Sequence, residues 1–345
     1  TLGASPAALG MIEGTAEAVA SLVKLVSGSI SDRATRRKPF IFVGYALSAC
    51  ARPLIAAART SFTVLVIRLV DRCGKGIRSA PRDALVAQVT DPASRGRAFG
   101  FQRAMDNVGA VVGPLLAAGA MALVSSLPRV FLLATIPGVL ASLAVLLGVK
   151  DRPVVPPSSS APPPEPGGSL PRGLPSYLVV LALFTLGNSS DTFLLLRAQE
   201  SGVSIGLIPI LWALHNLVKA GLSTPLGSLS DRIGRKLSIT IGWGMYALTY
   251  LGFAMTGLPM AVLFSVYALH YAFTEGPERA LVADFSAGVR GGRAFGLYHA
   301  VTGAMLLPAS LLTGALWKAF GAETALLTGA ALAAVATVGL VVLVP

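Results

Sequence analysis

One short basic motif occurs twice in this chain, and this repetition constrains the fold more than any other feature. The first copy runs Gly28-Ser-Ile-Ser-Asp-Arg-Ala-Thr-Arg-Arg-Lys38, and the second, Gly227-Ser-Leu-Ser-Asp-Arg-Ile-Gly-Arg-Lys236, starts 199 residues later. Each copy forms a hairpin between two long apolar segments. One half of the protein therefore repeats the other.

Two further pairs of segments support the duplication. Residues 81–87 match residues 277–283, and Arg97-Ala-Phe-Gly100 matches Arg293-Ala-Phe-Gly296, both at an offset of 196. Because the offsets are nearly equal, the two halves run in the same sense as parallel repeats.

The composition is that of a polytopic membrane protein. Only 13% of the residues are charged and the mean hydropathy is +0.71, whereas about a quarter of the residues are charged in an ordinary soluble domain. The net charge of +12 comes from Lys and Arg that stand mostly between apolar segments. This arrangement fits loops that face the cytoplasm rather than a nucleic-acid surface.

The apolar segments predict an all-α protein. A spanning helix needs about 20 apolar residues. Eleven segments meet this requirement: 5–27, 39–58, 61–88, 97–121, 127–149, 176–197, 204–226, 237–256, 258–285, 293–317 and 322–344. The second half carries one span more before its motif than the first half does, so we expect that a first helix is missing from this sequence and that the complete protein has six plus six.

The chain divides into two predicted bundles. Residues 1–149 form helices 2–6, residues 150–175 form a Pro- and Ser-rich linker that cannot be helical, and residues 176–345 form helices 7–12. The basic loops and the linker alternate with loops that carry few cations. By the positive-inside rule the linker and the C-terminus lie in the cytoplasm, and the protein is a multi-pass protein of the inner, cytoplasmic membrane.

The repeated motif resembles the signature loop of the major facilitator superfamily (MFS). The first copy matches it at Gly28, Asp32, Arg33, Arg36 and Arg37, while Thr35 stands where the family has glycine; the second copy matches at Gly227, Asp231, Arg232, Gly234, Arg235 and Lys236. The resemblance implies two six-helix bundles related by a pseudo-two-fold axis and transport by alternating access. In the family this cluster latches the bundles together on the cytoplasmic side; the alternative is that these residues only set the topology.

A second pattern lies in the span 97–121. Gly100, Gly109, Gly113 and Pro114 have the spacing of the motif associated with the drug/metabolite:proton antiporter branches, although Ala117 and Ala118 replace its last glycines. Small residues there permit tight packing, and proline kinks a helix. The alternative is ordinary packing of small residues in a membrane helix.

The span 61–88 carries six charged residues spaced three or four apart: Arg68, Asp71, Arg72, Lys75, Arg78 and Arg82. A charge at the centre of a bilayer costs at least ~2.5 kcal/mol on insertion scales. We therefore expect this face to line a wet cavity, with mutual neutralisation of Arg68, Asp71 and Arg72 as the alternative.

Coupling to protons requires a carboxylate that alternates between a cationic partner and a proton. The candidates are Asp71, Asp106, Glu13 and Asp191. The predicted substrate-binding residues are Arg72, Lys75, Arg103, Lys219, His270 and Glu275. Cations exceed acids among the intramembrane charges (Arg72, Lys75, Arg78, Arg103 and Lys219), which predicts an anionic or zwitterionic solute.

A charge exchange between the halves predicts a gate. The repeat places Glu278 and Arg279 where the first half has Arg82 and Asp83. We expect Arg82 to pair with Glu278, and Asp83 with Arg279, across the cytoplasmic mouth when the protein opens outward. Helix-end charges that serve topology are the alternative.

Together these features predict a secondary active transporter that exports a small organic solute, anionic or amphipathic, by proton antiport. Uptake by proton symport is the second prediction, and a facilitator or lipid flippase is the third. The sequence does not decide between protons and sodium as the driving ion. The sequence has no metal, nucleophile or phosphate motif, so we expect no enzyme and no cofactor. A receptor or assembly factor on this fold would be expected to lose the intramembrane charges. The expected partners are a small-molecule substrate, protons and the lipid bilayer, without nucleic acid, and the expected state is a monomer.

Overall fold

The computed structural model describes residues 6–124, 126–151, 170–255, 257–286 and 291–345, without the side chains of residues 6–16, 18, 61 and 127. These described residues form helices and turns, with no strand. The helices are α1 (Pro6–Ser31), α2 (Lys38–Leu54), α3 (Ser61–Val89), α4 (Arg95–Val124), α5 (Leu127–Leu133), α6 (Thr135–Gly148), α7 (Leu174–Gly187), α8 (Asp191–Glu200), α9 (Ile208–Ile233), α10 (Arg235–Ala254), α11 (Met260–Phe285) and α12 (Gly291–Leu343).

These helices follow the predicted spans in order. Helices α5 and α6 together cover the span 127–149, and α12 covers the last two spans. Gly321, with a φ of 89°, interrupts α12 between those two spans; a left-handed residue of this kind ends a helix, and glycine adopts it without steric cost. By length and composition, seven helical segments of the described chain could cross a membrane. Helices α3 and α11 are not among them because charged and polar side chains lower their hydropathy.

One predicted span, 176–197, is not a single continuous helix. The span 176–197 breaks into α7, which ends at Gly187, and α8, which begins at Asp191. The Ser190 side chain accepts a hydrogen bond from the Thr192 N–H and caps α8. Gly, Asn and Ser disfavour a helix interior, and a carboxylate is stabilised in the first turn of a helix. Asp191 therefore lies at a helix start and not in the middle of a continuous helix.

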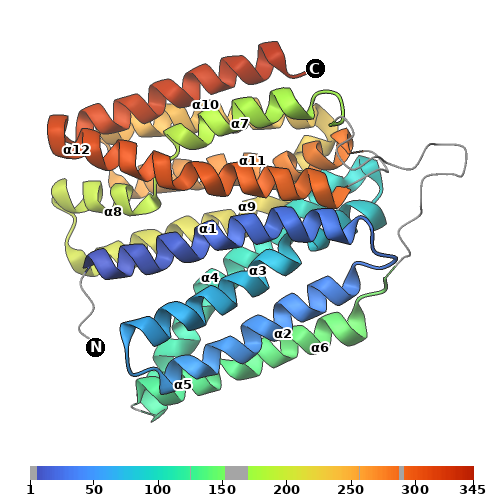
Figure 1. The fold of residues 1–345 in the computed structure, drawn as a ribbon. Helices are drawn as coiled ribbons and strands as arrows, with labels where there is room; N and C mark the ends of the chain where they lie inside the picture. The colour runs from blue at the N-terminus through green and yellow to red at the C-terminus, as the bar shows by residue number, and fades with distance from the viewer. Residues whose placement is uncertain (1–5, 125, 152–169, 256, 287–290) are drawn as a thin grey trace, which may run out of the picture. The chain divides into compact units, whose positions relative to one another are not determined.

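The chain forms two compact units, and each is described by itself. The first unit comprises Thr1–Val89, Gly113–Ser169 and Ser286–Gly303. In it α3 packs against both α1 and α2, and α2 packs against α6, so these helices lie side by side (Figure 1). A small core of Ile41, Leu85 and Val145 joins α2, α3 and α6.

The second unit comprises Thr90–Val112, Leu170–Phe285 and Ala304–Pro345. In it α11 packs against both α9 and α10. Its core is aromatic: the Phe184 ring stacks on Trp243 with 4.3 Å between centroids, and Tyr246 stacks on Tyr250 at 4.2 Å. Large rigid rings bury much apolar area, which stabilises this unit.

Each unit includes a segment from the opposite sequence half. Residues 90–112 belong to the second unit and residues 286–303 to the first, and these two segments start 196 residues apart, as the repeat requires. Glycines permit the close backbone contacts of these segments. A Cβ atom at Gly28 would lie 2.1 Å from the Gly292 oxygen, and one at Gly227 would lie 2.3 Å from the Gly96 oxygen. The predicted bundle limits 1–149 and 176–345 remain a proposal, and most of the predicted linker lies outside the described residues.

The close contact of Gly28 gives a test of the fold. We predict that Gly28→Ala lowers the free energy of unfolding by ~1–3 kcal/mol, because the new methyl group would overlap the Gly292 carbonyl. Gly221, in the repeat-related helix α9, is the matched control, because a Cβ there meets nothing within 4 Å. Gly221→Ala should keep or raise stability by up to about 1 kcal/mol, since alanine is the better helix former. Thermal unfolding in detergent measures both, and an unchanged midpoint for Gly28→Ala would contradict the contact.

Candidate functional site

In each unit a carboxylate from the repeated motif binds the start of a helix. In the first unit Asp32 accepts hydrogen bonds from the backbone N–H groups of Gly292 and Arg293, both at 2.8 Å. In the second unit Asp231 accepts bonds from Gly96 N–H at 2.9 Å and Arg97 N–H at 2.8 Å. The first N–H groups of a helix have no partner within the helix, and its N-terminus attracts negative charge. Each carboxylate therefore fixes a segment that comes from the other sequence half.

Each of these carboxylates also binds an arginine. The Arg235 guanidinium lies 2.6 Å from Asp231, and the Arg37 guanidinium lies 2.8 Å from Asp32. Both Arg36 and Arg37 match the signature in the first copy. Arg37 is only 5% exposed and binds Asp32, whereas Arg36 is exposed. The first loop also lacks the glycine of the second. Gly234, with a φ of 97°, lets α10 start directly after α9, whereas Thr35 does not favour that conformation and the first loop is longer.

The remaining signature residues have different surroundings. Arg33 and Arg232 are exposed, as expected for cations that set topology. Arg235 also lies 3.4 Å from Asp284, which binds Arg95 at 2.8 Å. The second motif is thus held by a network of two carboxylates and two arginines.

The charged stripe of α3 divides between two neighbouring helices. Towards α1, Arg72 and Lys75 lie 3.6 and 3.9 Å from the Glu17 carboxylate, which also binds Lys24 at 3.2 Å. Towards α2, Asp71 lies 3.8 Å from Arg52. The stripe therefore does not face one cavity as a whole, because α3 packs on both sides.

Arg78 belongs to the α2 side. It donates hydrogen bonds to the Ser48 hydroxyl at 2.9 Å and the Gly44 carbonyl at 3.3 Å, and its guanidinium lies 4.4 Å from the centre of the Tyr45 ring. These contacts compensate its charge. Arg78 thus joins α3 to α2 and is not a free cation.

Among the predicted coupling carboxylates, Asp106 has the partner that the sequence suggested. Asp106 lies 3.2 Å from Arg103, one turn earlier in α4, and its side chain is 45% exposed against 17% for Arg103. Asp71 pairs with Arg52, a partner that the sequence did not suggest. Glu13 lies among the residues whose side chains are not described.

Asp191 is held by tyrosines. At the start of α8 its carboxylate accepts hydrogen bonds from the hydroxyls of Tyr267 at 2.6 Å and Tyr271 at 3.2 Å, and these two hydroxyls are 3.0 Å apart. The ammonium group of Lys219 lies 3.9 Å from the centre of the Tyr271 ring, a cation–π contact. Asp191, Tyr271 and Lys219 therefore form one polar cluster on α8, α9 and α11.

The other predicted substrate ligands of the second unit differ in access. His270 is 1% exposed, and its Nδ1 lies 2.9 Å from the Gly242 carbonyl oxygen. Its ring packs among Phe184 and Tyr246, and its role in substrate binding stays a prediction. The Glu275 Oε2 atom has no hydrogen-bond partner among the described residues. The positive charges of Lys219 and Arg103 attract the Glu275 carboxylate. Glu275 thus has spare capacity to bind a donor.

The predicted gate residues make contacts within their own units. Asp83 is fully buried, and its carboxylate lies 3.3 Å from Arg82 and 2.9 Å from His299. Glu278 accepts a hydrogen bond from the Trp243 indole at 3.0 Å, and Arg279 donates one to the Glu275 carbonyl. Pairing of Arg82 with Glu278 and of Asp83 with Arg279 would join the two units and stays a prediction.

The antiporter-like motif is only partly packed. A Cβ atom at Gly100 would lie 2.3 Å from the Ser223 oxygen, so α4 and α9 approach closely there. The tight packing predicted for Gly109 and Gly113 is wrong, since a Cβ at either meets nothing within 4 Å in the described chain. Helix α4 belongs to the second unit up to Val112 and to the first unit from Gly113. Pro114 lies inside α4.

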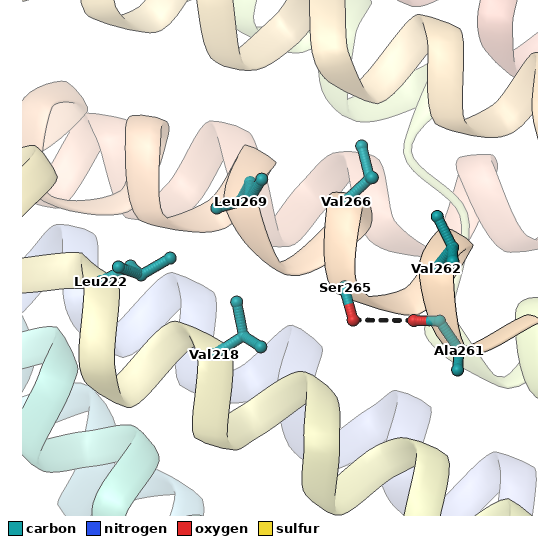
Figure 2. A pocket seen from close by; sticks show the side chains of 7 residues that line it. All are labelled: Val218, Leu222, Ala261, Val262, Ser265, Val266 and Leu269. Atoms are coloured by element: carbon teal, nitrogen blue, oxygen red, sulfur yellow. Dashed lines mark hydrogen bonds between the residues drawn. The ribbon is translucent and has the colours of Figure 1, made fainter.

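Two hollows lie on the second unit. One, of about 460 Å³, is lined by Val218, Leu222, Ala261, Val262, Ser265, Val266 and Leu269 of α9 and α11 (Figure 2). Its hydroxyl, on Ser265, already donates to the Ala261 carbonyl, so this hollow offers apolar surface and no free donor to a solute (Figure 2). The other, of about 380 Å³, lies between α4 and α9 and contains Arg97, Phe101 and Thr224.

Sequence reasoning missed Glu17, the tyrosines around Asp191 and Arg52. Glu17 stands one turn after Glu13 and seven residues before Lys24, a spacing that places all three on one face of α1. Tyr267 and Tyr271 are four residues apart in α11, but nothing in the sequence connects them to α8. Among the described residues, no group of three or more His, Cys, Asp or Glu is placed to hold a metal ion.

Comparison with known proteins agrees with this architecture. The sequence profile of the Major Facilitator Superfamily matches residues 1–197 and 176–345. An uncharacterised MFS-type transporter of Methanocaldococcus jannaschii is 35% identical over 343 residues, 96% of this chain and 85% of that protein. Two solved structures share the fold over 96% of this chain. The human organic anion transporter MFSD10 matches with a TM-score of 0.78 and 17% sequence identity, and 83% of its chain is covered. The Escherichia coli fucose:proton symporter FucP matches with a TM-score of 0.77 and 13% sequence identity, and 90% of its chain is covered.

The helix-binding carboxylates generate a prediction. Asp231→Asn should cost ~1–3 kcal/mol of local stability at the start of α4, because the charge that binds the Gly96 and Arg97 N–H groups is lost. Hydrogen–deuterium exchange of residues 95–98 should become faster. Asp284→Asn is the control. In the described structure the Asp284 carboxylate contacts Arg95 and Arg235 but accepts no hydrogen bond from the N–H groups of Gly96 and Arg97. Equal exchange in both variants would show that the loss comes from the arginine network instead.

Proposed function

The chain belongs to the major facilitator superfamily, and we propose that it exports a small organic solute, anionic or amphipathic, in exchange for protons. Transport would proceed by alternating access, with the solute unchanged chemically. The proposed location is the inner, cytoplasmic membrane, with the basic loops and the C-terminus in the cytoplasm, as a monomer.

The observation that carries this proposal is the Arg103–Asp106 pair on α4. Its atoms are 3.2 Å apart, and the carboxylate is the more exposed partner. Protonation of Asp106 would release Arg103, and an arriving anion could bind Arg103 instead. The pair stands between Gly100 and Gly109 of the antiporter-like motif, so the titratable group and the motif belong to the same helix.

Two more carboxylates can take part in the proton step. Asp71 faces Arg52, and Asp191 accepts bonds from two tyrosine hydroxyls. A carboxylate in an apolar region needs a cation, a hydrogen-bond donor or a proton, and each can replace another. The excess of cations on α3 supports a negatively charged solute, which Arg72 and Lys75 would attract.

A transport assay tests the proposal. The purified protein would be reconstituted in vesicles that contain a pH-sensitive dye, and organic anions, amphipathic drugs and sugars would be added with sodium or choline as the cation. We expect an anionic or amphipathic compound to move protons in the opposite direction, in either salt. Protons that travel with the compound would show symport, and flux without protons would show a facilitator; either result overturns the proposal.

Asp106→Asn should reduce the proton flux by about tenfold or more while the compound still binds, because Asn cannot take up a proton. Glu200→Gln is the matched control. Glu200 also forms an ion pair with an arginine three residues earlier, Arg197 at 3.8 Å, but lies in α8 away from the motif. Coupled flux that persists in Asp106→Asn would assign the proton step to another carboxylate.

A further inference from the structure

The smaller hollow of the second unit, of about 380 Å³, lies where α4 begins, next to α9. All the residues that line it belong to this one unit, so the hollow is complete within a single compact body. Four of them are polar and two are apolar: Thr90, Ser94, Arg97, Ala98, Phe101 and Thr224.

The four polar side chains have no partner within the described chain. The Arg97 guanidinium forms no ion pair and donates no hydrogen bond to a described residue, and only its backbone N–H is bonded, to Asp231. The three hydroxyls likewise make no hydrogen bond with a described residue; they belong to Thr90, Ser94 and Thr224. One positive charge and three hydroxyl donors are therefore available to a ligand.

Two carboxylates that are close to the hollow in sequence make other contacts. Asp231 accepts the N–H groups at the start of α4 and binds Arg235. Asp91 accepts a hydrogen bond from the Ala93 N–H and does not line the hollow. The Arg97 guanidinium therefore keeps its fork of N–H donors for an anion. A phosphodiester fits this set, because its oxygens accept two N–H bonds from one arginine and further bonds from hydroxyls.

An exposed apolar strip of α4 continues from the hollow. Phe101, Met105 and Val108 follow Arg97 at intervals of four, four and three residues, which places all of them on one helical face. Their exposed fractions are 55%, 48% and 39%. An acyl chain can lie along such a strip, which a soluble phosphate would leave uncovered.

The depth of Arg97 also favours a lipid. Arg97 is two residues from the start of α4, at one end of a segment, Pro92–Val124, that could cross a membrane. Lipid phosphates lie at the ends of such segments, and the proposed topology puts this end at the cytoplasmic surface. Basic pockets between membrane helices on that side bind the head groups of anionic lipids.

The hollow is separate from the proposed coupling pair. Asp106 stands nine residues after Arg97, and at about 3.6 residues per turn this spacing puts the two side chains on opposite faces of α4. Binding in the hollow therefore does not depend on the proposed transport function.

We propose that this hollow binds one anionic phospholipid of the cytoplasmic leaflet. The Arg97 guanidinium and the hydroxyls of Thr90, Ser94 and Thr224 hold the phosphodiester, and an acyl chain lies on Phe101 and the strip beyond it. The bound lipid would join the start of α4 to α9, next to the contact that Asp231 makes with the backbone.

Two lipids with the same chains test the proposal. Dioleoyl phosphatidylglycerol carries a net negative charge, and dioleoyl phosphatidylcholine carries none. Native mass spectrometry of the purified full-length protein in neutral detergent would count the molecules of each lipid that stay bound. The wild-type protein should retain one phosphatidylglycerol about fivefold more tightly than phosphatidylcholine, because one arginine contributes about that factor near a lipid phosphate.

Three variants locate the preference. Arg97→Gln should reduce the ratio of the two affinities to about one, while the backbone N–H of residue 97 can still bind Asp231. Thr224→Val, which keeps the shape of the side chain, should weaken phosphatidylglycerol binding by about threefold because one hydroxyl is lost. Arg232→Gln is the matched control: Arg232 is an exposed arginine of α9 in the same unit that does not line the hollow. This variant should keep the preference.

Three results would overturn the proposal. Equal retention of both lipids by the wild-type protein would show no charge selectivity, and an equal loss in Arg97→Gln and Arg232→Gln would show attraction by general surface charge. Displacement of the lipid by an equal concentration of inorganic phosphate would show a site for the free ion. If Arg97→Gln does not fold, Thr224→Val decides the question, and unchanged phosphatidylglycerol binding in that variant would exclude the hollow.

Discussion

The need to compensate every ionised group at membrane depth is the constraint on which this structure depends. It explains why α3 places Arg72 and Lys75 against α1, and Asp71 and Arg78 against α2. A charged stripe facing lipid would cost at least several kcal/mol. The helix can exist in a membrane only because its neighbours supply carboxylates, hydroxyls, carbonyls and an aromatic ring.

The same constraint gives the two repeats one shared device. Asp32 and Asp231 each bind two backbone N–H groups at a helix start and one arginine. An ionised acceptor satisfies donors that would otherwise be unpaired, so a single side chain fixes a whole segment.

Outside this device the two units differ in chemistry. The first unit gathers cations around one carboxylate, Glu17. The second gathers aromatic rings around Asp191, with Lys219 on the face of Tyr271. Duplication thus supplied two similar helical frames, and their side chains diverged into a cationic cluster and an aromatic, acidic one.

The class of protein, the order of its helices, the duplication and the two motifs could be predicted from the amino-acid sequence, because apolar length and repeated local patterns need no knowledge of distant contacts. The sequence also located the charged positions of α3 and the Arg103–Asp106 pair, which is local. Which partner each charge has follows from the packing of the helices: Arg52 for Asp71, Arg37 for Asp32, Glu17 among three cations, and two tyrosines for Asp191. These contacts depend on how helices pack and where α7 breaks, and no spacing along one helix encodes the face of another.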